Sequence, residues 1–440
     1  MSSTTADILA PPPGAFRKTK WSIIWLLTLS LFSALTVGGL LAPLQEAVKA
    51  DLGMTDLQLG MMAGMASAVP IALLSLPLAW MVDHGTRTRL LVILATLWAV
   101  GTIGAAFAQD FYSLFLVRLV AGIGGGCVFP VLISILADVC MPDRRGRSML
   151  LVSIGAWGGA AAAFAIGGAL YGYLESHPAF GFAGMAPWRE THLIVGIGAA
   201  LLVLPLFFIK EPTRYEVETT STDLREVARA FWRRRSFLGP LFLGQLTGGM
   251  AEGAAALWIG SLMARQFGLT PGQFGPLAGM IILGSGVVGS VIGGFAADAG
   301  NKLKLRGGIL LPALIATALT IPAGAYSIMP TVAGFCWVLF ALLVGGTIVN
   351  LVTSAAIAVL IPNEERAMCL AGQKIVGTIF GGLLMLPLIG WMTTAFDGPK
   401  GLGLAVAIVG VATGVISTIG FWLAMVNAPR PFADPVPAAA

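Results

Sequence analysis

The sequence predicts an all-α membrane protein of twelve transmembrane helices, arranged as two related six-helix bundles. Of its 440 residues, 57% are hydrophobic and 11% are charged, and the mean hydropathy is +0.88. This composition excludes an ordinary soluble domain. Long apolar runs alternate with short polar loops, and the pattern of charged loops recurs at an offset of roughly half the chain.

The apolar runs are long enough to cross a bilayer, whose hydrocarbon core requires about 20 apolar residues per helix. They show no alternation with period two and are too long for barrel strands, which indicates helices. The twelve predicted spans lie near residues 21–43, 57–82, 90–108, 113–139, 149–172, 192–209, 237–264, 272–297, 307–326, 330–359, 367–395 and 403–426.

The internal repeat divides the chain into two bundles. Asp83 in the loop after the second span recurs as Asp298 after the eighth, and the charged loop that begins at Pro142 recurs at Pro362. A parallel repeat of this kind predicts a first bundle over 21–209 and a second over 237–426.

Three polar segments flank the bundles. The linker 210–236 is rich in Arg and is either a solvated helix or a helix lying on the inner membrane surface. Segments 1–20 and 427–440 are expected to be cytoplasmic, and the Pro/Ala-rich tail is expected to lack regular structure. The first apolar run is too long for a signal-peptide core, so it is expected to be retained as a span.

The distribution of Lys and Arg predicts that both termini face the cytoplasm. With that orientation, most of the 26 Lys and Arg residues fall in cytoplasmic segments. Two fall within spans, and the outer loops contain only Lys49, Arg189, Arg265 and Lys400. The net charge of +5 follows from this bias and does not indicate nucleic-acid binding.

No cofactor or metal site is expected. The four cysteines lie in or at the ends of spans, without the spacing of a disulfide framework or a metal site. A Gly-Lys-Ser/Thr phosphate loop is absent, which disfavours direct ATP drive. A membrane enzyme is disfavoured because no nucleophile, base and metal ligands cluster together. A receptor or scaffold remains the alternative outside transport, although the chain lacks a sizeable soluble domain.

Three motifs resemble the major facilitator superfamily. The loop after the second span retains Asp83 and Arg87 of the signature Gly-x-x-x-Asp-Arg-x-Gly-Arg, and its counterpart after the eighth span retains Asp298 with Lys302 as the cation. The fourth span contains Arg118 followed by paired glycines, like the membrane-embedded Arg of that family. The resemblance implies a secondary transporter in which spans 1, 4, 7 and 10 line a central cavity.

Within that superfamily, the chain looks most like bacterial Spinster-type transporters. The segment 46–60, the pair Trp188-Arg189 and the run Glu211-Pro212-Thr213-Arg214 resemble the corresponding segments of those proteins. Those relatives carry an Asp-Arg pair in span 1 and a Glu in span 4 for proton coupling. The aligned positions here are Val37-Gly38 and Gly125, so the lipid-type substrates of those relatives cannot be assumed, and an acid for proton coupling has to be sought elsewhere in the chain.

Glu252 is the strongest candidate for that acid. It lies about fifteen residues into the seventh span, which is on the order of 22 Å along the helix. A charge at the bilayer centre costs roughly 3 kcal/mol or more, so Glu252 is expected to face a cavity or a partner. We hypothesise that it binds the coupled proton; the alternative is a fixed counter-ion or a hydrogen-bonded structural acid.

Other polar residues in the spans are candidate cavity residues. Arg118 faces the cavity or anchors its helix near the outer surface, and Lys374 faces the cavity, snorkels or pairs with another helix. Small polar residues in span 1 line the cavity or bond the backbone. The full candidate set for substrate and protons is Glu252, Arg118, Gln245, Asn350, Ser354, Thr347, Ser33, Thr36 and Lys374.

The loop charges are candidate gating residues. Asp83 is expected to interact with the positive N-terminal end of the eleventh span, and Arg87 and Arg147 are expected to pair with acids such as Asp138. The resemblance implies that these contacts form when the cytoplasmic side is closed. The full gating set is Asp83, Arg87, Asp138, Arg147, Asp298, Lys302 and Arg366.

These features predict a monomeric transporter of the bacterial inner membrane that moves a small organic solute or an amphiphile by alternating access. Its expected partners are the small-molecule or lipid-like substrate, protons and membrane lipids. Coupling to protons through Glu252 is the favoured mechanism. An uncoupled facilitator and a multidrug or lipid exporter are the alternatives within transport.

Overall fold

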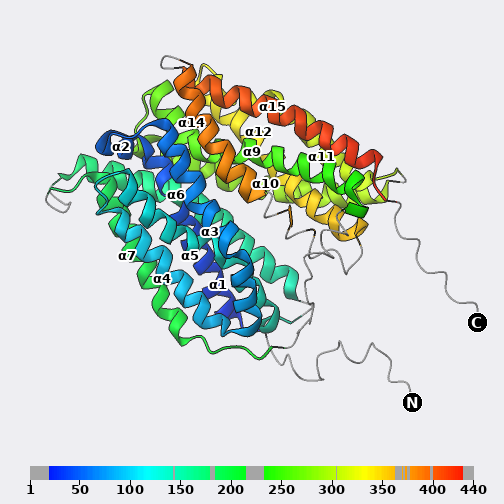
Figure 1. Ribbon diagram of the computed structural model, residues 1–440, viewed down its shortest axis with the longest axis horizontal. Helices are drawn as coiled ribbons and strands as arrows, with labels where there is room; N and C mark the ends of the chain where they lie inside the picture. Colours follow the sequence, from blue (N-terminus) through cyan, green and yellow to red (C-terminus); the bar gives the residue numbers. More distant parts are fainter. Residues whose placement is uncertain are drawn as a thin grey trace, which may run out of the picture. The chain divides into compact units, whose positions relative to one another are not determined.

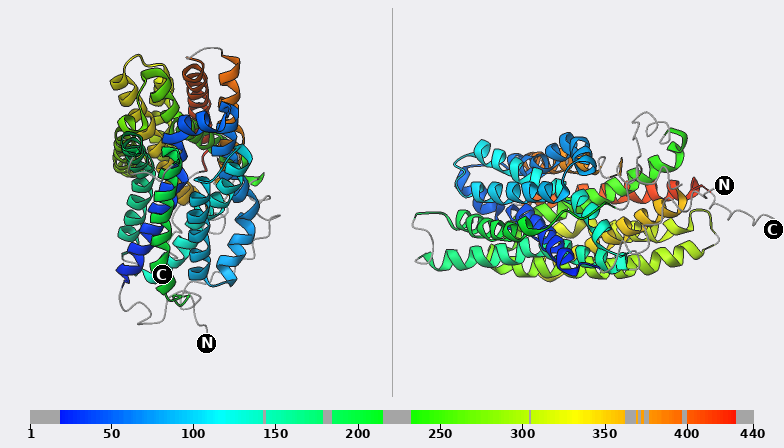
Figure 2. Two further views of the ribbon diagram at one scale, coloured as in Figure 1. Left: turned by 90° about the vertical axis from the view of Figure 1, so that its left-hand side faces the viewer. Right: turned by 90° about the horizontal axis from the view of Figure 1, so that it is seen from below.

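The computed structural model describes residues 19–141, 144–178, 184–214, 232–303, 305–361, 369, 372–373, 377–396 and 400–429. Within these ranges the chain forms helices joined by turns and short connections (Figures 1 and 2). The predicted all-α fold is confirmed, and every predicted span coincides with a helix or with two or three consecutive helical segments.

Among the first six spans, the first, second and fifth extend beyond their predicted C-terminal ends, and the other three end within three residues of the prediction. The first continues after Gly39 as a second helix that ends at Leu52, and the sixth ends in a 3-10 turn. The elements are α1 (Trp21–Gly39), α2 (Leu41–Leu52), α3 (Asp56–His84), α4 (Arg87–Ala105), α5 (Phe111–Val139), α6 (Arg145–Ser176), α7 (Pro187–Val203) and η4 (Leu204–Phe208).

Two of the last six spans are irregular. Pro322 interrupts the ninth, because proline lacks the backbone N–H needed to continue a helix, and the eleventh contains a π-helix over Thr378–Met385. The elements are α9 (Arg235–Phe267), α10 (Pro271–Lys302), η5 (Gly308–Leu310), α11 (Leu311–Thr320), η6 (Pro322–Ile328), α12 (Val332–Leu360), η7 (Thr378–Met385), α14 (Leu386–Ala395) and α15 (Gly401–Val426).

Ten helical stretches in the described part of the chain are long and apolar enough to cross a membrane. A shorter apolar stretch covers Phe380–Ala395. Together with α9, which spans 33 residues, these stretches account for the twelve predicted spans.

Local capping explains several helix ends. Asp110 and Ser113 form a reciprocal capping box at the start of α5, with the Ser113 backbone N–H donating to Asp110 Oδ1 at 2.7 Å. Thr331 accepts from the Gly334 backbone N–H at the start of α12. The α9 helix ends at Gly268, whose φ of +66° is the left-handed conformation that glycine adopts most readily.

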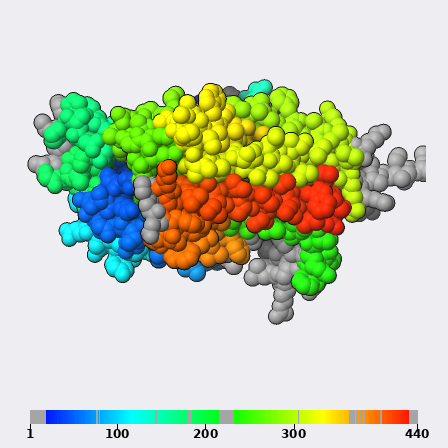
Figure 3. Space-filling view, turned by 90° about the horizontal axis from the view of Figure 1, so that it is seen from above, coloured from blue at the N-terminus to red at the C-terminus, as the bar shows by residue number. Residues whose placement is uncertain are grey.

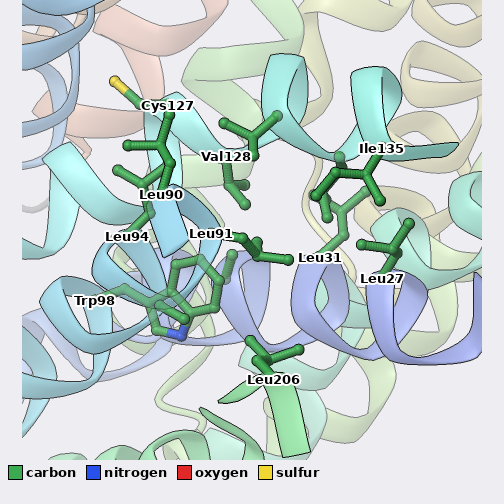
Figure 4. Close-up of a cluster of buried hydrophobic side chains, with 14 of the residues drawn as sticks. Leu27, Leu31, Leu90, Leu91, Leu94, Trp98, Cys127, Val128, Ile135 and Leu206 are labelled. Carbon is green, nitrogen blue, oxygen red and sulfur yellow. The ribbon is translucent and has the colours of Figure 1, made fainter. Parts of the chain in front are cut away.

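The chain folds into two compact units. Unit 1 comprises Met1–Val48, Ala66–Ser221 and Pro271–Gly279, and unit 2 comprises Lys49–Met65, Thr222–Thr270 and Met280–Ala440. The core of unit 1 contains Leu31, Leu91, Val128 and Leu206 from four different elements, and Figure 4 shows these side chains gathered together. The core of unit 2 combines α9, α10, α11, α12 and α15.

Apolar side chains also cover exposed helix surfaces, as lipid-facing helices require. Along α15 the exposed residues include Leu404, Ile408, Ile419 and Trp422. Figure 3 shows α15, in red, as a continuous ridge on one face. This surface is consistent with a helix that contacts lipid on one side and the unit 2 core on the other.

Glycines allow α4 and α5 to approach closely. A Cβ built on Gly124 of α5 would lie 2.4 Å from the Leu94 carbonyl oxygen and 2.6 Å from the Trp98 nitrogen of α4. A Cβ on the adjacent Gly125 would meet only the Ala34 carbonyl oxygen, at an ordinary 3.5 Å. The two neighbouring glycines therefore differ in their structural roles.

This difference makes a testable prediction for stability. Gly124→Ala should destabilise the protein by about 1–3 kcal/mol, because it forces α4 and α5 apart. Gly125→Ala is the matched control and should be neutral or slightly stabilising, because alanine is the better helix former. Thermal unfolding of both variants in the same detergent measures the effect. Equal losses in the two variants would contradict the assignment.

Candidate functional site

Glu252 lies in the middle of α9 and is partly buried. Its Oε2 lies 2.8 Å from the position that a Cβ on Gly346 would take, so the carboxyl group packs directly on the backbone of α12. No hydrogen bond or ion pair of this carboxyl group is found among the described residues. An unpaired acid at mid-helix is unusual in a membrane span and points to a functional role.

The other predicted polar residues of unit 2 do not all share one surface. Gln245 is partly buried on α9, and its Oε1 has no partner within the described ranges. Thr347 donates to the Leu343 carbonyl oxygen at 3.0 Å and packs against Gly289 of α10. Farther along α12, Asn350 is exposed and Ser354 donates to the Asn350 carbonyl oxygen at 2.9 Å.

Arg118 is buried in unit 1. It is 7% exposed, and its NH2 donates to the Gly38 carbonyl oxygen of α1 at 2.9 Å. Its NH1 lies 3.5 Å from the Val37 carbonyl oxygen, and its Nε has no partner in the described part of the chain. Two backbone carbonyls therefore solvate this cation in place of a carboxylate.

Ser33 and Thr36 of α1 are both buried. The Thr36 hydroxyl lies within hydrogen-bond distance of the Phe32 carbonyl oxygen at 2.8 Å and the Gly159 carbonyl oxygen of α6 at 3.2 Å. Thr36 thus connects α1 to α6. Threonine hydroxyls in membrane spans commonly form such hydrogen bonds with a neighbouring helix.

His192 of α7 is a buried polar residue that the sequence did not single out. It is fully buried, and its Nδ1 lies 2.8 Å from the Trp188 carbonyl oxygen. Its Nε2 has no partner among the described residues. A single histidine in an apolar run carries no distinctive sequence signal, so only the structure reveals this orphaned nitrogen.

Arg87 organises a polar network at the start of α4. Its side chain is 3% exposed and pairs with Asp138 of α5. Its Nε also donates to Glu211 Oε1 at 2.8 Å, and its NH2 donates to the Pro212 carbonyl oxygen at 3.0 Å. One guanidinium therefore ties α4 to α5 and to the segment after η4.

Glu211 completes that network. Its Oε2 accepts from the Thr88 backbone N–H at 2.8 Å and from the Thr88 hydroxyl at 2.9 Å. Burial alone would raise the pKa of Glu211, but hydrogen bonds from Thr88 and Arg87 lower this pKa below its ordinary value. Sequence resemblance identified Glu211 as part of a motif but did not indicate these partners.

Arg214 binds the C-terminal end of α3 and the residue that follows it. Its NH2 donates to the Val82 carbonyl oxygen at 2.8 Å and to the Gly85 carbonyl oxygen at 2.6 Å, and its NH1 donates to the Asp83 carbonyl oxygen. The Asp83 residue itself is exposed. The backbone at the end of α3 is thus fixed, while the Asp83 carboxylate remains at the surface.

The remaining predicted gating residues are peripheral or lie outside the described residues. Arg147, Asp298 and Lys302 are exposed. Arg366 and Lys374 lie outside the described residues, as do most of the linker 210–236 and the end of the tail.

A second charged cluster surrounds Asp56 in unit 2. Arg265 of α9 donates to both carboxylate oxygens of Asp56, at 2.7 Å and 2.6 Å. Lys49 of α2 lies 2.5 Å from Oδ1, and the Thr393 hydroxyl of α14 donates to Oδ2 at 3.0 Å. Asp56 is 8% exposed, and this cluster joins elements that are more than 200 residues apart in sequence.

Close backbone packing supports the Asp56 cluster. Gly60 and Gly64 follow Asp56 on α3 at a spacing of four residues. A Cβ on Gly60 would lie 2.4 Å from the Leu386 carbonyl oxygen, and one on Gly64 would lie 2.0 Å from the Gly382 carbonyl oxygen. Small residues at this spacing allow two helices in a membrane to touch through their backbones.

The fold and these buried charges define a multi-pass membrane protein that carries polar groups within its spans. The family model described as "Major Facilitator Superfamily" matches residues 26–371. The chain belongs to that superfamily, and it is accordingly a membrane transporter of small solutes and not an enzyme.

Curated relatives include exporters and transporters of organic solutes. An MFS-type efflux pump of Mycolicibacterium smegmatis is 24% identical over 391 residues, which cover 87% of this chain and 87% of the relative. A probable sulfoacetate transporter of Cupriavidus necator is 24% identical and covers 69% of this chain and 72% of its own length. A cis,cis-muconate transport protein of Acinetobacter baylyi is also 24% identical, and the match covers 88% of this chain and 90% of the relative.

Solved structures support the fold. A bacterial homologue of the human lysosomal transporter Spinster, in an inward-facing and unoccupied conformation, superposes with a TM-score of 0.78. It is 19% identical, and the match covers 93% of this chain and 97% of that chain. The predicted resemblance to the superfamily, and to Spinster-type proteins in particular, is confirmed at the level of the fold.

The Glu211 network generates a pH-dependent prediction. The folded-state pKa of Glu211 is lowered, so its ionised form stabilises the protein at neutral pH, and this contribution is lost as the pH falls through that lowered pKa. Because Glu211 is partly exposed, Glu211→Gln should reduce stability by less than about 1 kcal/mol at pH 7.

Thermal unfolding of wild type and Glu211→Gln between neutral and acidic pH measures this contribution. The difference between them should be largest at neutral pH and should vanish under acidic conditions. Glu175→Gln, which removes an exposed carboxylate at the end of α6, is the control. A difference that grows under acidic conditions would contradict the assigned sign.

Proposed function

We propose that this chain is a proton-coupled secondary transporter that moves a small organic solute across the bacterial inner membrane by alternating access. The observation that carries the proposal is the Glu252 carboxyl group, which lies at mid-helix against the Gly346 backbone without a cationic partner among the described residues. Burial disfavours the ionised form of such an acid, so it can take up and release a proton as its surroundings change.

The alternative of a fixed counter-ion has less support. A counter-ion requires a cation within a few ångströms, and the Glu252 carboxyl group meets the backbone of a glycine. The cation of the first bundle, Arg118, is solvated by the carbonyl oxygens of Val37 and Gly38. The two charges thus have separate environments, and each can respond to a proton or to a substrate.

A small carboxylate is the first substrate class to test. Relatives named as transporters of sulfoacetate, gallate and cis,cis-muconate all act on small carboxylates. A buried arginine without a carboxylate partner among the described residues favours an anionic substrate. The second candidate is export of a solute, because an MFS-type efflux pump is similar to this chain over 87% of both sequences.

In this proposal the bundles 21–209 and 237–426 move relative to each other, with both termini in the cytoplasm. The residues that contribute to cytoplasmic gating are Arg87, Asp138, the exposed residues Asp83, Arg147, Asp298 and Lys302, and Arg366. The Asp56 cluster is then a latch at the outer end, because it fastens the α2–α3 segment of the first half to α9 and α14 of the second. Release of this latch accompanies opening toward the outside.

The coupling role of Glu252 is tested in proteoliposomes. Glu252→Gln should reduce accumulation of a carboxylate driven by a pH gradient by at least about tenfold, because the amide cannot carry the proton. Solute counterflow, which needs no net proton movement, should persist. Glu175→Gln, with an exposed carboxylate removed, should behave as wild type.

A second variant keeps this test decisive if Glu252→Gln folds poorly. Gly346→Ala retains the acid but displaces its carboxyl group, since the new Cβ would lie 2.8 Å from Oε2. It should shift the pH dependence of uptake without abolishing counterflow. Undiminished pH-driven accumulation in Glu252→Gln would overturn the coupling role and favour an uncoupled facilitator.

The latch role of Asp56 is tested by hydrogen exchange. Arg265→Gln removes two charge-assisted hydrogen bonds from Asp56, which should weaken the local closed state by about 1–3 kcal/mol. Amides of residues 56–65 and 390–395 should then exchange roughly 5- to 150-fold faster. Lys400→Gln, an exposed cation before α15, is the control. Unchanged exchange in Arg265→Gln would remove the latch from the mechanism.

A further inference from the structure

Unit 1 contains a surface groove of about 600 Å³ that the transport proposal does not use. It lies where the first two turns of α4 meet η4 and the residues that follow it. Its polar end is lined by Thr86, Thr88, Arg89 and Glu211, and apolar side chains one turn deeper line the rest. The groove therefore has a polar end and an apolar part, as an amphiphilic ligand does.

The apolar part of the groove is open to its surroundings. Ile93 is 53% exposed and Phe207 is 64% exposed, and both line the groove. Leu206 forms its floor and is 2% exposed; Figure 4 shows this side chain directed into the unit 1 core. Both walls belong to membrane spans, so a hydrocarbon chain is the natural occupant of this part.

The polar end carries uncommitted positive charge. Arg89 lines the groove, Lys210 lies in sequence between two of its lining residues, and both are exposed. Glu211 does not provide a free acid, because Oε1 accepts from Arg87 and Oε2 accepts from Thr88. Because Arg87 pairs with both Asp138 and Glu211, this network keeps one net negative charge, and the two cations Arg89 and Lys210 leave the polar end with one net positive charge.

The spacing of the two parts matches a lipid. Arg89 precedes Ile93 by four residues, which is about 6 Å along the helix. The polar end coincides with the beginning of the α4 span and the end of the α7–η4 span. A headgroup bound at Arg89 thus lies at the membrane boundary, with its acyl chain directed along the groove into the hydrocarbon layer.

We propose that this groove binds one membrane phospholipid with an anionic headgroup. The phosphate contacts Arg89 and Lys210, and one acyl chain lies along Ile93 and Phe207. The bound lipid covers the surface next to the network of Arg87 and Glu211, and so braces the start of α4 against the segment that leads into the linker.

Native mass spectrometry of the full chain, titrated with phosphatidylglycerol in detergent, tests this proposal. A cation near a membrane surface contributes about 1 kcal/mol to attraction of anionic lipid. Arg89→Gln should therefore weaken binding about fivefold, and Arg89→Gln with Lys210→Gln about 30-fold. Arg147→Gln, an exposed arginine at the start of α6, is the charge control and should bind as wild type does.

A second pair of variants tests the apolar part. Phe207→Ala should weaken binding of phosphatidylglycerol, whereas Phe208→Ala should not, because Phe208 is 84% exposed and does not line the groove. Wild type should also prefer phosphatidylglycerol over phosphatidylcholine, since only the former carries net negative charge.

Three results would overturn the proposal. One is equal binding by wild type and the double variant. Another is an equal loss in Arg147→Gln, which would mean that overall charge and not the groove attracts lipid. The third is a preference for phosphatidylethanolamine that does not depend on Arg89. Because the readout is lipid binding, it is independent of whether Glu252 couples protons.

Discussion

The cost of removing a charge from water governs the polar architecture of this protein. Each buried charged group among the described residues must find an opposite charge, a set of backbone dipoles or a changeable protonation state. Arg87 finds Asp138 and Glu211, Asp56 finds Arg265 and Lys49, and these clusters lie at the ends of helices. Paired groups of this kind stabilise particular arrangements of helices, which suits them to gating.

In the described part of the chain, the charged residues within the spans are not stabilised by an opposite charge. Arg118 is solvated by two carbonyl oxygens near the end of α1, and Glu252 contacts a glycine backbone in α12. Neither group has a carboxylate or guanidinium partner among the described residues. An acid can lose its charge by binding a proton, and so avoid the cost of a buried charge without a partner, whereas an arginine stays charged. This asymmetry is the basis of the proposal that Glu252 binds the coupled proton and that Arg118 attracts an anion.

The sequence predicted the helices well because each span needs only local information. The apolar length of a run, the polar loop after it and the positions of Lys and Arg are all readable without tertiary contacts. The pairing of Arg87 with Asp138 was also foreseeable, since both carry charge at neighbouring helix ends. The break before η6 is readable from Pro322, but the π-helix η7 is not, because nothing in its apolar sequence distinguishes it from a regular helix.

The residues that the sequence missed depend on contacts between distant segments. Asp56 and Arg265 are 209 residues apart, and each alone reads as an ordinary charge at the edge of a loop. Gly346 is one of 57 glycines, and only its approach to Glu252 distinguishes it. His192 is apparent only because its Nε2 has no partner within the described ranges.

The internal repeat acquires a more specific meaning from these contacts. Asp83 and Asp298 are both exposed at equivalent places, so the acids of the repeated loop have similar environments. Their companion cations do not. Arg87 is buried in a network within unit 1, whereas Lys302 is exposed at the end of α10. The first copy of the loop has therefore committed its cation to holding α4, α5 and the linker segment together. Lys302 of the second copy has no partner among the described residues. In the proposed gating, Arg87 therefore acts by fixing the helices of its own unit, and Lys302 is the cation that can still pair with a new partner.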